Sequence, residues 1–259
     1  MPGSVCDTAQ MGPEIHWTEN MFDTYEYLNR IGYYGSHVLS AETLSELHKA
    51  QLETIPYDGT ETASAHTSAG FEDAYERIVR GWRGGRCTDL NRLFAALLRQ
   101  FGFDVRELTA DVAPSIALHE PRHTLNRVTV GAESWLLDVG FPGPSFLEPL
   151  RLMPGIVQEQ YGCLYRIVGG LILQRKSLSR DWHTVYRIRT RTRSSPERHA
   201  GIHPVYARAV GRGQLIVSGD RYMRVEDGYE NVRRLDPGDG ENAINEILHS
   251  WEFPALASS

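Results

Sequence analysis

The chain is poor in cysteine, lacks long hydrophobic runs and has no excess of basic residues. Its 259 residues include three cysteines, Cys6, Cys87 and Cys163, whose wide spacing excludes a CxxC metal motif and a disulfide framework. No apolar run reaches the length of about 18 residues that a membrane-spanning helix needs. The formal net charge of −6 argues against general nucleic-acid binding. We therefore expect no metal, membrane or nucleic-acid partner, and a reducing cytoplasmic location in which a thiol stays free.

Residues 1–20 have neither the basic start nor the apolar centre of a signal peptide, and we predict that they form a polar tail. The chain as a whole is 41% hydrophobic, which is enough for a substantial buried core. Its length suits one large domain or two to three subdomains that share a core.

The first hundred residues carry helical patterns. One helix has a broad apolar face formed by Leu90, Leu93, Phe94, Leu97, Leu98 and Phe101, which recur at helical spacing. We predict helices over residues 22–32, 40–56, 71–81 and 87–100. Ser40 is the expected N-cap of the second helix, and Pro56 its stop.

After Gly102 the pattern changes to short segments rich in Val, Thr and Tyr, which are typical of antiparallel strands. We predict strands within residues 104–112, 124–131, 134–141, 164–176, 183–193 and 212–227, and a last helix over about 241–251. The sequence therefore predicts an α+β protein. Its expected parts are a helical bundle (21–103), an antiparallel β-barrel or sheet (104–193) and a mixed C-terminal part (194–259).

Cys87 lies at the predicted start of the fourth helix, directly after a glycine pair. Unpaired N–H groups and the helix dipole favour an anion there, so a thiolate is stabilised. Gly84 and Gly85 allow a tight turn and a close approach of the backbone to a substrate. These features make Cys87 a candidate nucleophile.

A cysteine nucleophile needs a base and a group that orients the base. His123 precedes a predicted strand, and Asp138 lies in the otherwise apolar stretch "SWLLDVGF". A hairpin through "GAES" would bring the two together as in a Cys-His-Asp triad. His119 is an alternative base. From the pattern alone, an inert core cysteine and a structural buried carboxylate are alternatives for Cys87 and Asp138.

Three stretches resemble the arylamine N-acetyltransferase family. They are "YLNRIGYYG…SAETLSELHKAQLETIPY", "RGGRCTDLNRLFAALLRQFGFDV" and "HTLNRV…SWLLDVGF", in the family's order. The family's motif Arg-Gly-Gly-aromatic-Cys-x-Glu-x-Asn is matched at Arg83, Gly84, Gly85, Cys87 and Asn91, and its Asp-Val-Gly-Phe motif at residues 138–141. The resemblance implies that Cys87, His123 and Asp138 are catalytic. It also implies that Arg83, Gly84, Gly85, Asp89 and Asn91 support them.

The same resemblance implies a fold and a reaction. The fold is a helical bundle with the cysteine, a β-barrel with His and Asp, and an α/β lid, around a cysteine-protease-like core. The reaction is a ping-pong acyl transfer, with no bound cofactor, from acetyl-coenzyme A or another acyl thioester to a small amine. A polyketide branch of the family, in which an amide synthase takes an acyl chain from a carrier protein, is the alternative.

The sequence departs from the family pattern around the expected substrate. Arg86 replaces the aromatic residue before the cysteine, Thr88 and Asp89 follow it, Pro142 follows the Asp-Val-Gly-Phe motif, and Tyr206 lies after His203-Pro204. We therefore expect Arg86, Thr88, Phe141, Pro142 and Tyr206 to contact substrate in a rebuilt pocket. Arg83 is expected to pair with Asp89.

Two further interpretations stay open. Arg187, Arg189, Arg191 and Arg193 alternate along one predicted strand and suit phosphates or an acidic carrier protein, but a solvated strand face or protection of a sheet edge is the simpler explanation. A Cys-His-Asp triad also occurs in cysteine hydrolases, and the changed pocket is compatible with a non-catalytic binding protein.

Overall fold

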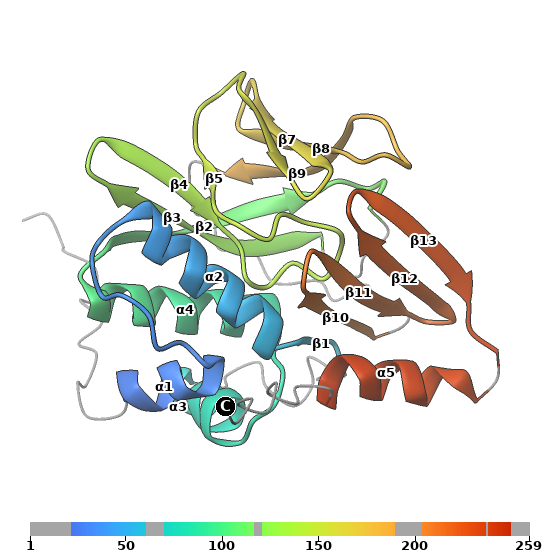
Figure 1. Ribbon diagram of the computed structural model, residues 1–259, viewed down its shortest axis with the longest axis horizontal. Coiled ribbons are helices and arrows are strands. Elements are labelled where there is room, and N and C mark those ends of the chain that lie inside the picture. The colour runs from blue at the N-terminus through green and yellow to red at the C-terminus, as the bar shows by residue number, and fades with distance from the viewer. Residues whose placement is uncertain (1–21, 61–69, 117–120, 190–203, 237, 250–259) are drawn as a thin grey trace, which may run out of the picture.

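The computed structural model describes residues 22–60, 70–116, 121–189, 204–236 and 238–249. A group of helices lies under one edge of a large curved sheet, and a smaller sheet with its own helix lies beside them (Figure 1). The predicted α+β class is confirmed. The expected polar tail, residues 1–20, lies outside the described residues.

The helices begin and end at local sequence signals. They are α1 (Thr24–Ile31), α2 (Ala41–Thr54), α3 (Phe71–Tyr75) with a π-helical continuation over Glu76–Arg80, and α4 (Cys87–Phe101). Ser40 caps α2 by accepting a hydrogen bond from Thr43 N at 3.2 Å. Gly102 ends α4 in a left-handed conformation with φ of 98°, which glycine adopts without strain. The four predicted helices are thus present, and the third contains a π turn that its sequence did not predict.

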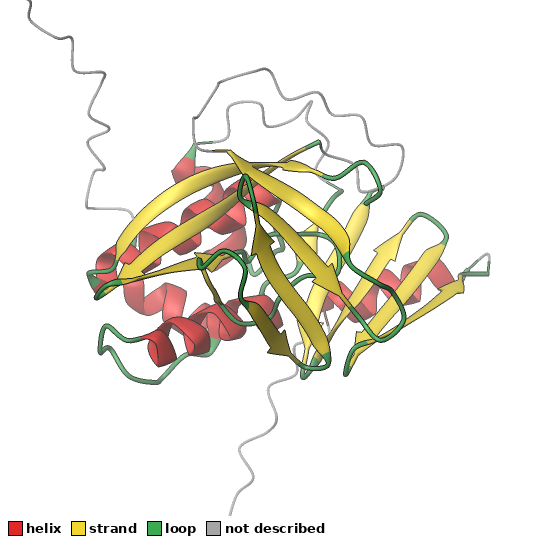
Figure 2. Ribbon diagram, turned by 90° about the horizontal axis from the view of Figure 1, so that it is seen from above, coloured by secondary structure: helices red, strands yellow, loops and turns green. Residues whose placement is uncertain are grey.

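The large sheet is fully antiparallel and strongly curved (Figure 2). Its strands are β2 (Asp104–Val112), β3 (Arg122–Val130), β4 (Glu133–Leu137), β5 (Leu150–Arg151), β6 (Val157–Gln160), β7 (Cys163–Val168), β8 (Ile172–Lys176) and β9 (His183–Arg189). Their spatial order is β5-β4-β3-β2-β9-β8-β7-β6. The short strands β5 and β6 were not predicted.

The β3–β4 hairpin determines where the candidate base and its partner lie. Val130 pairs with Glu133 across a tight turn that contains Gly131 at φ of 59°. Further along, Asn126 pairs with Leu137. The residue after β4, Asp138, therefore lies beside the start of β3, as the predicted hairpin requires.

The smaller sheet has the order β1-β10-β11-β12-β13 and is covered by α5 (Figure 1). Its elements are β1 (Tyr57–Asp58), β10 (Val205–Val210), β11 (Gly213–Ser218), β12 (Arg221–Glu226), β13 (Tyr229–Arg234) and α5 (Asp239–His249). The sequence predicted β11 and β12, but not β1, β10 or β13. Because β1 comes from residues 57–58, the smaller sheet recruits a strand from the predicted helical segment. The proposed division at residues 103 and 193 stays a prediction.

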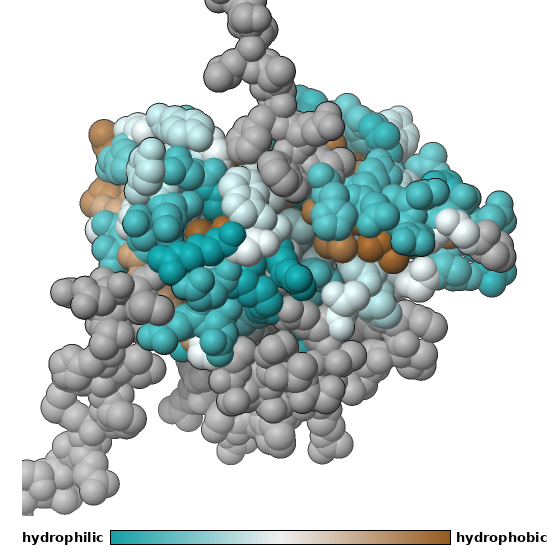
Figure 3. Space-filling view, turned by 90° about the horizontal axis from the view of Figure 1, so that it is seen from below, coloured by the Kyte–Doolittle hydropathy of each residue, from teal (hydrophilic) through white to brown (hydrophobic). Residues whose placement is uncertain are grey.

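Apolar side chains form three cores. α4 supplies Leu93, Phe94, Leu97 and Leu98, all with no exposed surface, to the core shared by the helices and both sheets. A second core fills the curve of the large sheet, and a third lies between the smaller sheet and α5. Hydrophilic residues cover most of the described surface on the face seen in Figure 3. None of the described helices is long and apolar enough to cross a membrane.

Candidate active site

Cys87 is the first residue of α4, and only 4% of its surface is exposed. The chain reaches it through a glycine loop that packs directly on β1. A Cβ atom on Gly84 would lie 2.7 Å from Pro56 O and 2.8 Å from Asp58 Cβ. Gly85 N donates to Pro56 O at 3.2 Å, and Gly85 O accepts from Asp58 N at 3.0 Å. The two glycines thus allow the close packing that fixes the position of the sulfur.

The start of α4 favours negative charge at Cys87. Arg86 is the N-cap residue, and its side chain makes no capping hydrogen bond because a guanidinium has no acceptor. The N–H groups of the first turn and the helix dipole therefore act on the region of the sulfur. Thr88 Oγ1 lies 3.8 Å from Cys87 Sγ.

His123 and Asp138 form a buried pair. His123 Nε2 lies 2.7 Å from Asp138 Oδ2, and the two side chains are 2% and 0% exposed. The Cys87 thiol is hydrogen-bonded to His123. Since Nε2 faces Asp138, the other ring nitrogen, Nδ1, is the one available to the sulfur. The structure therefore brings together the three residues that the sequence singled out.

Two side chains and one backbone N–H hold the Asp138 carboxylate. Asn91, on α4, donates from Nδ2 to Asp138 Oδ1 at 3.3 Å and to Thr124 O at 2.7 Å. Tyr186, on β9, donates its hydroxyl to Asp138 Oδ2 at 3.2 Å. Gly140 N donates to Asp138 Oδ1 at 3.2 Å. The carboxylate thus accepts several bonds, as a buried charge requires.

Gly140 lets this segment approach the nucleophile. A Cβ atom at residue 140 would lie 2.8 Å from both Cys87 Cα and Asn91 Nδ2. Any larger residue would push the segment after β4 away from α4. The glycine of the Asp-Val-Gly-Phe motif is therefore explained by close packing rather than by an unusual backbone conformation.

The electrostatic interactions favour a thiolate beside an imidazolium. Burial opposes ionisation of Cys87, but its hydrogen bond to His123 and the imidazolium charge outweigh burial and lower the thiol pKa. Burial likewise opposes charge on His123, yet Asp138 and Cys87 raise its pKa to about 10. The pKa of Asp138 is lowered despite burial because His123, Gly140 N–H and Asn91 favour the carboxylate.

The predicted supporting residues fall into two groups. Gly84, Gly85 and Asn91 pack or bond directly around Cys87. The expected Arg83–Asp89 pair is wrong: Asp89 pairs with Arg77, whose Nη2 lies 2.8 Å from Asp89 Oδ2. Arg77 lies in the π-helical segment Glu76–Arg80, and Arg83 is exposed.

Four of the predicted substrate contacts lie near Cys87 and His123, and the fifth lies elsewhere. Arg86 and Thr88 flank Cys87, and Phe141 packs against His123 with ring centroids 5.1 Å apart. Pro142 is half-buried beside Phe141. Tyr206 lies in the core between the smaller sheet and α5, a placement that does not support contact with substrate.

The structure describes only part of the predicted arginine stripe, and it does not describe the alternative base. His119, Cys6, Arg191 and Arg193 lie outside the described residues. Of the arginine stripe, Arg189 is neutralised by Asp111, with Nη2 2.7 Å from Oδ1, and Arg187 is exposed. The stripe is therefore at least partly an ordinary charged strand face.

Sequence reasoning missed three side chains around the site. His48 bonds to Asp138 N at 3.0 Å, Tyr186 bonds to the carboxylate, and the buried Tyr57 is hydrogen-bonded to Arg86. These residues belong to α2, β9 and β1, all far from Cys87, His123 and Asp138 in the chain. The sequence around each of the three gives no local sign of these contacts.

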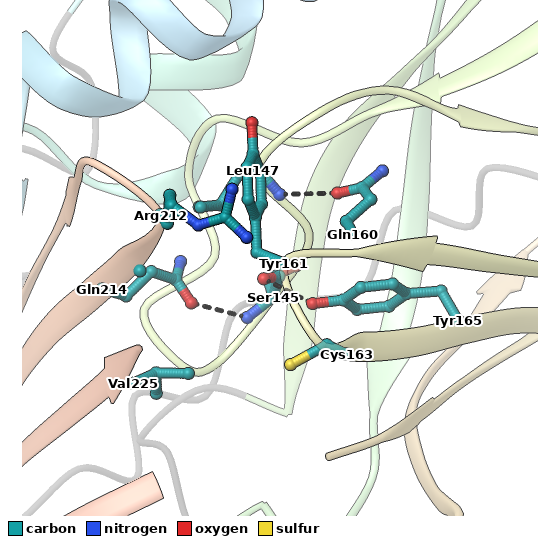
Figure 4. A pocket seen from close by; sticks show the side chains of 10 residues that line it. Ser145, Leu147, Gln160, Tyr161, Cys163, Tyr165, Arg212, Gln214 and Val225 are labelled. Atoms are coloured by element: carbon teal, nitrogen blue, oxygen red, sulfur yellow. Dashed lines mark hydrogen bonds between the residues drawn. The ribbon is translucent and has the colours of Figure 1, made fainter. Parts of the chain in front are cut away.

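A separate small pocket lies where the two sheets meet (Figure 4). Tyr165 donates its hydroxyl to Ser145 O at 2.9 Å, and Ser145 N donates to Gln214 Oε1 at 2.9 Å. Its lining includes none of the three candidate catalytic residues. Within the described ranges, His, Cys, Asp and Glu side chains form no cluster that could hold a metal ion.

Comparisons with known proteins agree with this arrangement. A family model described as N-acetyltransferase matches residues 40–248. Proansamycin X synthase of Amycolatopsis mediterranei is 33% identical over 87% of this chain and 96% of its own length. Arylamine N-acetyltransferase of Escherichia coli is 31% identical over 62% of this chain, and the match spans 59% of the E. coli protein.

The fold is similar to that of a solved relative. The arylamine N-acetyltransferase of Mycobacterium marinum, determined in complex with CoA, superimposes with a TM-score of 0.75 over 86% of this chain and 91% of that chain, at 24% identity. The region that the family model matches, residues 40–248, contains Cys87, His123 and Asp138. The chain belongs to the arylamine N-acetyltransferase family of acyltransferases.

Proposed function

We propose that the chain forms amides by ping-pong transfer of an acyl group from a thioester, through Cys87, to an amine. The observation that carries the proposal is the buried chain of contacts from Cys87 through His123 to Asp138. Such a chain supplies a nucleophile, a proton acceptor and a group that orients the acceptor.

In the first half-reaction, the Cys87 thiolate attacks the thioester carbonyl. We assign stabilisation of the oxyanion to the N–H groups in the first turn of α4, next to Cys87. Collapse of the tetrahedral intermediate expels the donor thiolate, which takes a proton from the His123 imidazolium. The acyl group is now a thioester of Cys87, and His123 is neutral.

In the second half-reaction, the amine attacks the Cys87 thioester. Neutral His123 accepts the proton that the nitrogen loses, and Asp138 stabilises the imidazolium that forms. The Cys87 thiolate leaves, and the amide is released. The starting thiolate–imidazolium pair is thereby restored.

The donor is an acyl thioester of coenzyme A type, with acetyl-coenzyme A as the first choice. The M. marinum relative determined with CoA supports this choice. Arg86 and Thr88 beside the sulfur, and Phe141 beside His123, are the proposed substrate contacts. Arg86 places a cation where the family pattern has an aromatic ring, which favours an acceptor specialised beyond simple arylamines.

An amide synthase that takes its acyl chain from a carrier-protein thioester is the second candidate. The likeness to proansamycin X synthase favours it, because that match spans 96% of the relative, compared with 59% for the E. coli acetyltransferase. The chemistry at Cys87 is the same in both candidates. They differ in the donor and in whether the amine belongs to the same molecule as the acyl chain.

Intact mass spectrometry tests the proposal. The wild-type protein and the variants Cys87→Ala and Cys163→Ala are exposed briefly to acetyl-coenzyme A or to a longer acyl N-acetylcysteamine thioester. We expect wild type and Cys163→Ala to gain one acyl mass, and Cys87→Ala to gain none. Acylation of Cys87→Ala would refute the proposal.

The donor that reacts distinguishes the two candidates. Acylation by acetyl-coenzyme A, followed by amide formation with added amine, supports the acetyltransferase. Acylation only by the long thioester, or faster acylation from a carrier protein than from the free thioester, supports the amide synthase. Loss of the acyl group at the same rate with and without amines would instead indicate a hydrolase.

A further inference from the structure

His48, on α2, is fully buried and uses both ring nitrogens on backbone groups near the candidate site. Nδ1 lies 2.9 Å from Leu147 O, and Nε2 lies 3.0 Å from Asp138 N. A carbonyl only accepts and a backbone N–H only donates. The two partners therefore fix the tautomer: Nδ1 carries the proton, and Nε2 accepts from Asp138 N–H.

The surroundings keep the ring in place and uncharged. Phe146 stacks on it with centroids 5.8 Å apart and an interplanar angle of 11°, and Phe94 packs edge-on at 6.2 Å. Burial lowers the pKa of His48 to about 4, although Leu147 O, Asp138 and Glu148 act in the opposite direction. At neutral pH the ring is a rigid acceptor for Asp138 N–H.

The backbone from Asp138 to Gly140 is held by its N–H groups. Asp138 N donates to His48, Val139 N donates to Asn91 Oδ1 at 3.1 Å, and Gly140 N donates to Asp138 Oδ1 at 3.2 Å. Side chains of α2 and α4 thus accept hydrogen bonds from the N–H groups of two consecutive residues, Asp138 and Val139. Asp138 Oδ2 remains to face His123.

We propose that His48 is a positioning residue, which aims the Asp138 carboxylate at His123 by holding the Asp138 peptide. The inference rests on the proposed function. Without the acceptor, Asp138 N–H would be a buried donor with no partner, and the peptide would rotate to satisfy it. That rotation would carry the carboxylate away from His123 Nε2.

Two substitutions of His48 test the roles of its two ring nitrogens separately. His48→Gln retains an acceptor near the position of Nε2, whereas His48→Asn retains a donor near the position of Nδ1 and loses the acceptor. Both remove the ring, and Asn leaves the larger space because its side chain is one methylene shorter than that of Gln. The exposed His37, which stacks on Phe101, provides a control substitution, His37→Asn.

We expect His48→Asn to lose about 10²-fold in acylation rate, the scale of a misplacement of about 1 Å in a catalytic group. His48→Gln and His37→Asn should stay within a few-fold of wild type. The pH profile of Cys87 alkylation, followed by mass spectrometry of the Cys87 peptide, should shift to higher pH in His48→Asn only. A thiol that loses an oriented imidazolium has a higher pKa.

A double-mutant cycle with Asp138→Asn completes the test. If His48 acts through the carboxylate, His48→Asn should add little once the carboxylate is gone. Equal loss in His48→Gln and His48→Asn, an unshifted alkylation profile or additive effects would each overturn the inference. Failure of wild-type Cys87 to become acylated would refute the proposed function instead, and the alkylation profile would still test His48.

Discussion

The two cysteines that the structure describes, Cys87 and Cys163, are equally buried but have different neighbours. Each has 4% of its surface exposed, and both are free thiols. Cys87 contacts His123, which can give and take a proton. Cys163 Sγ accepts a hydrogen bond from Arg175 Nη2 at 3.1 Å, and a guanidinium stays charged. Burial is therefore not what makes a thiol a candidate nucleophile; the proton chemistry of its neighbour is.

The neighbours beyond the first contact differ as well. His123 is hydrogen-bonded to Asp138. Asp138 is in turn held in place by hydrogen bonds to His48, Asn91 and Tyr186. Arg175 forms a buried ion pair with Glu230 on β13, and this pair joins the two sheets. The first arrangement can pass a proton, whereas the second connects two parts of the fold. The following experiments test this contrast.

The largest effect is expected from Asp138→Asn. The amide no longer stabilises the imidazolium and can hold His123 in the wrong tautomer, so acyl transfer should fall by about 10⁴-fold. Single-turnover acylation of Cys87 measures it, with circular dichroism to confirm folding. Retention of more than a tenth of the wild-type rate would show that Asp138 has only a structural role.

The next effect concerns the thiolate. His123→Gln removes the cation that lowers the Cys87 pKa, so the thiol should return to the few per cent of thiolate that a free cysteine has at pH 7. Alkylation of the Cys87 peptide at pH 7 should slow about tenfold or more. The Cys163 peptide provides the internal reference, because its rate should not change.

Arg175→Met should lower the stability of the protein and leave acylation of Cys87 nearly unchanged, the reverse of the two preceding substitutions. It leaves Glu230 partly buried without its partner, and breaking a buried ion pair costs about 3–5 kcal/mol of stability. Urea unfolding should show this loss, while acylation of Cys87 below the transition stays within a few-fold of wild type. A large loss of acylation with unchanged stability would contradict a purely structural role.

The smallest effect is a dependence of stability on pH. Folded His48 has a pKa of about 4, below the ordinary value of 6.5, so between these values the unfolded chain binds a proton that the folded chain excludes. The free energy of unfolding should fall by about 1.4 kcal/mol for each pH unit lost in this window. His123 contributes no slope there, because its folded pKa is raised and it is protonated in both states.

His48→Gln should reduce that slope, and Arg175→Met should leave it unchanged. Urea unfolding at several pH values from 6.5 to 4 makes the measurement. An identical slope in wild type and His48→Gln would mean that His48 is not excluded from protonation in the folded protein.

The sequence predicted the parts of the site that depend on local signals. Helical spacing placed Cys87 at a helix start, and a two-residue turn in "GAES" placed Asp138 beside His123. Each of these inferences involves a short stretch of chain in which periodicity and turn chemistry decide the structure.

The parts that were missed depend on contacts between distant segments. His48 and Asp138 lie on elements that meet only through the packed core, and a polar residue on an amphipathic helix gives no local sign of its partner. Asp89 pairs with Arg77, which lies in the π turn at residues 76–80, and not with Arg83. Strand β1 has only two residues, which is too few for any alternating pattern.

Strand β1 also has a consequence for the order in which the protein assembles. It pairs with β10 through Tyr57 and Ala207, and it bonds on its other side to Gly85 in the loop before the nucleophile. A ribosome releases residue 57 long before residue 207, so this edge stays unpaired through most of translation. The loop before Cys87 and the smaller sheet are therefore expected to reach their final positions late in folding. In a protein truncated before β10, Cys87 should not be held in its position next to His123.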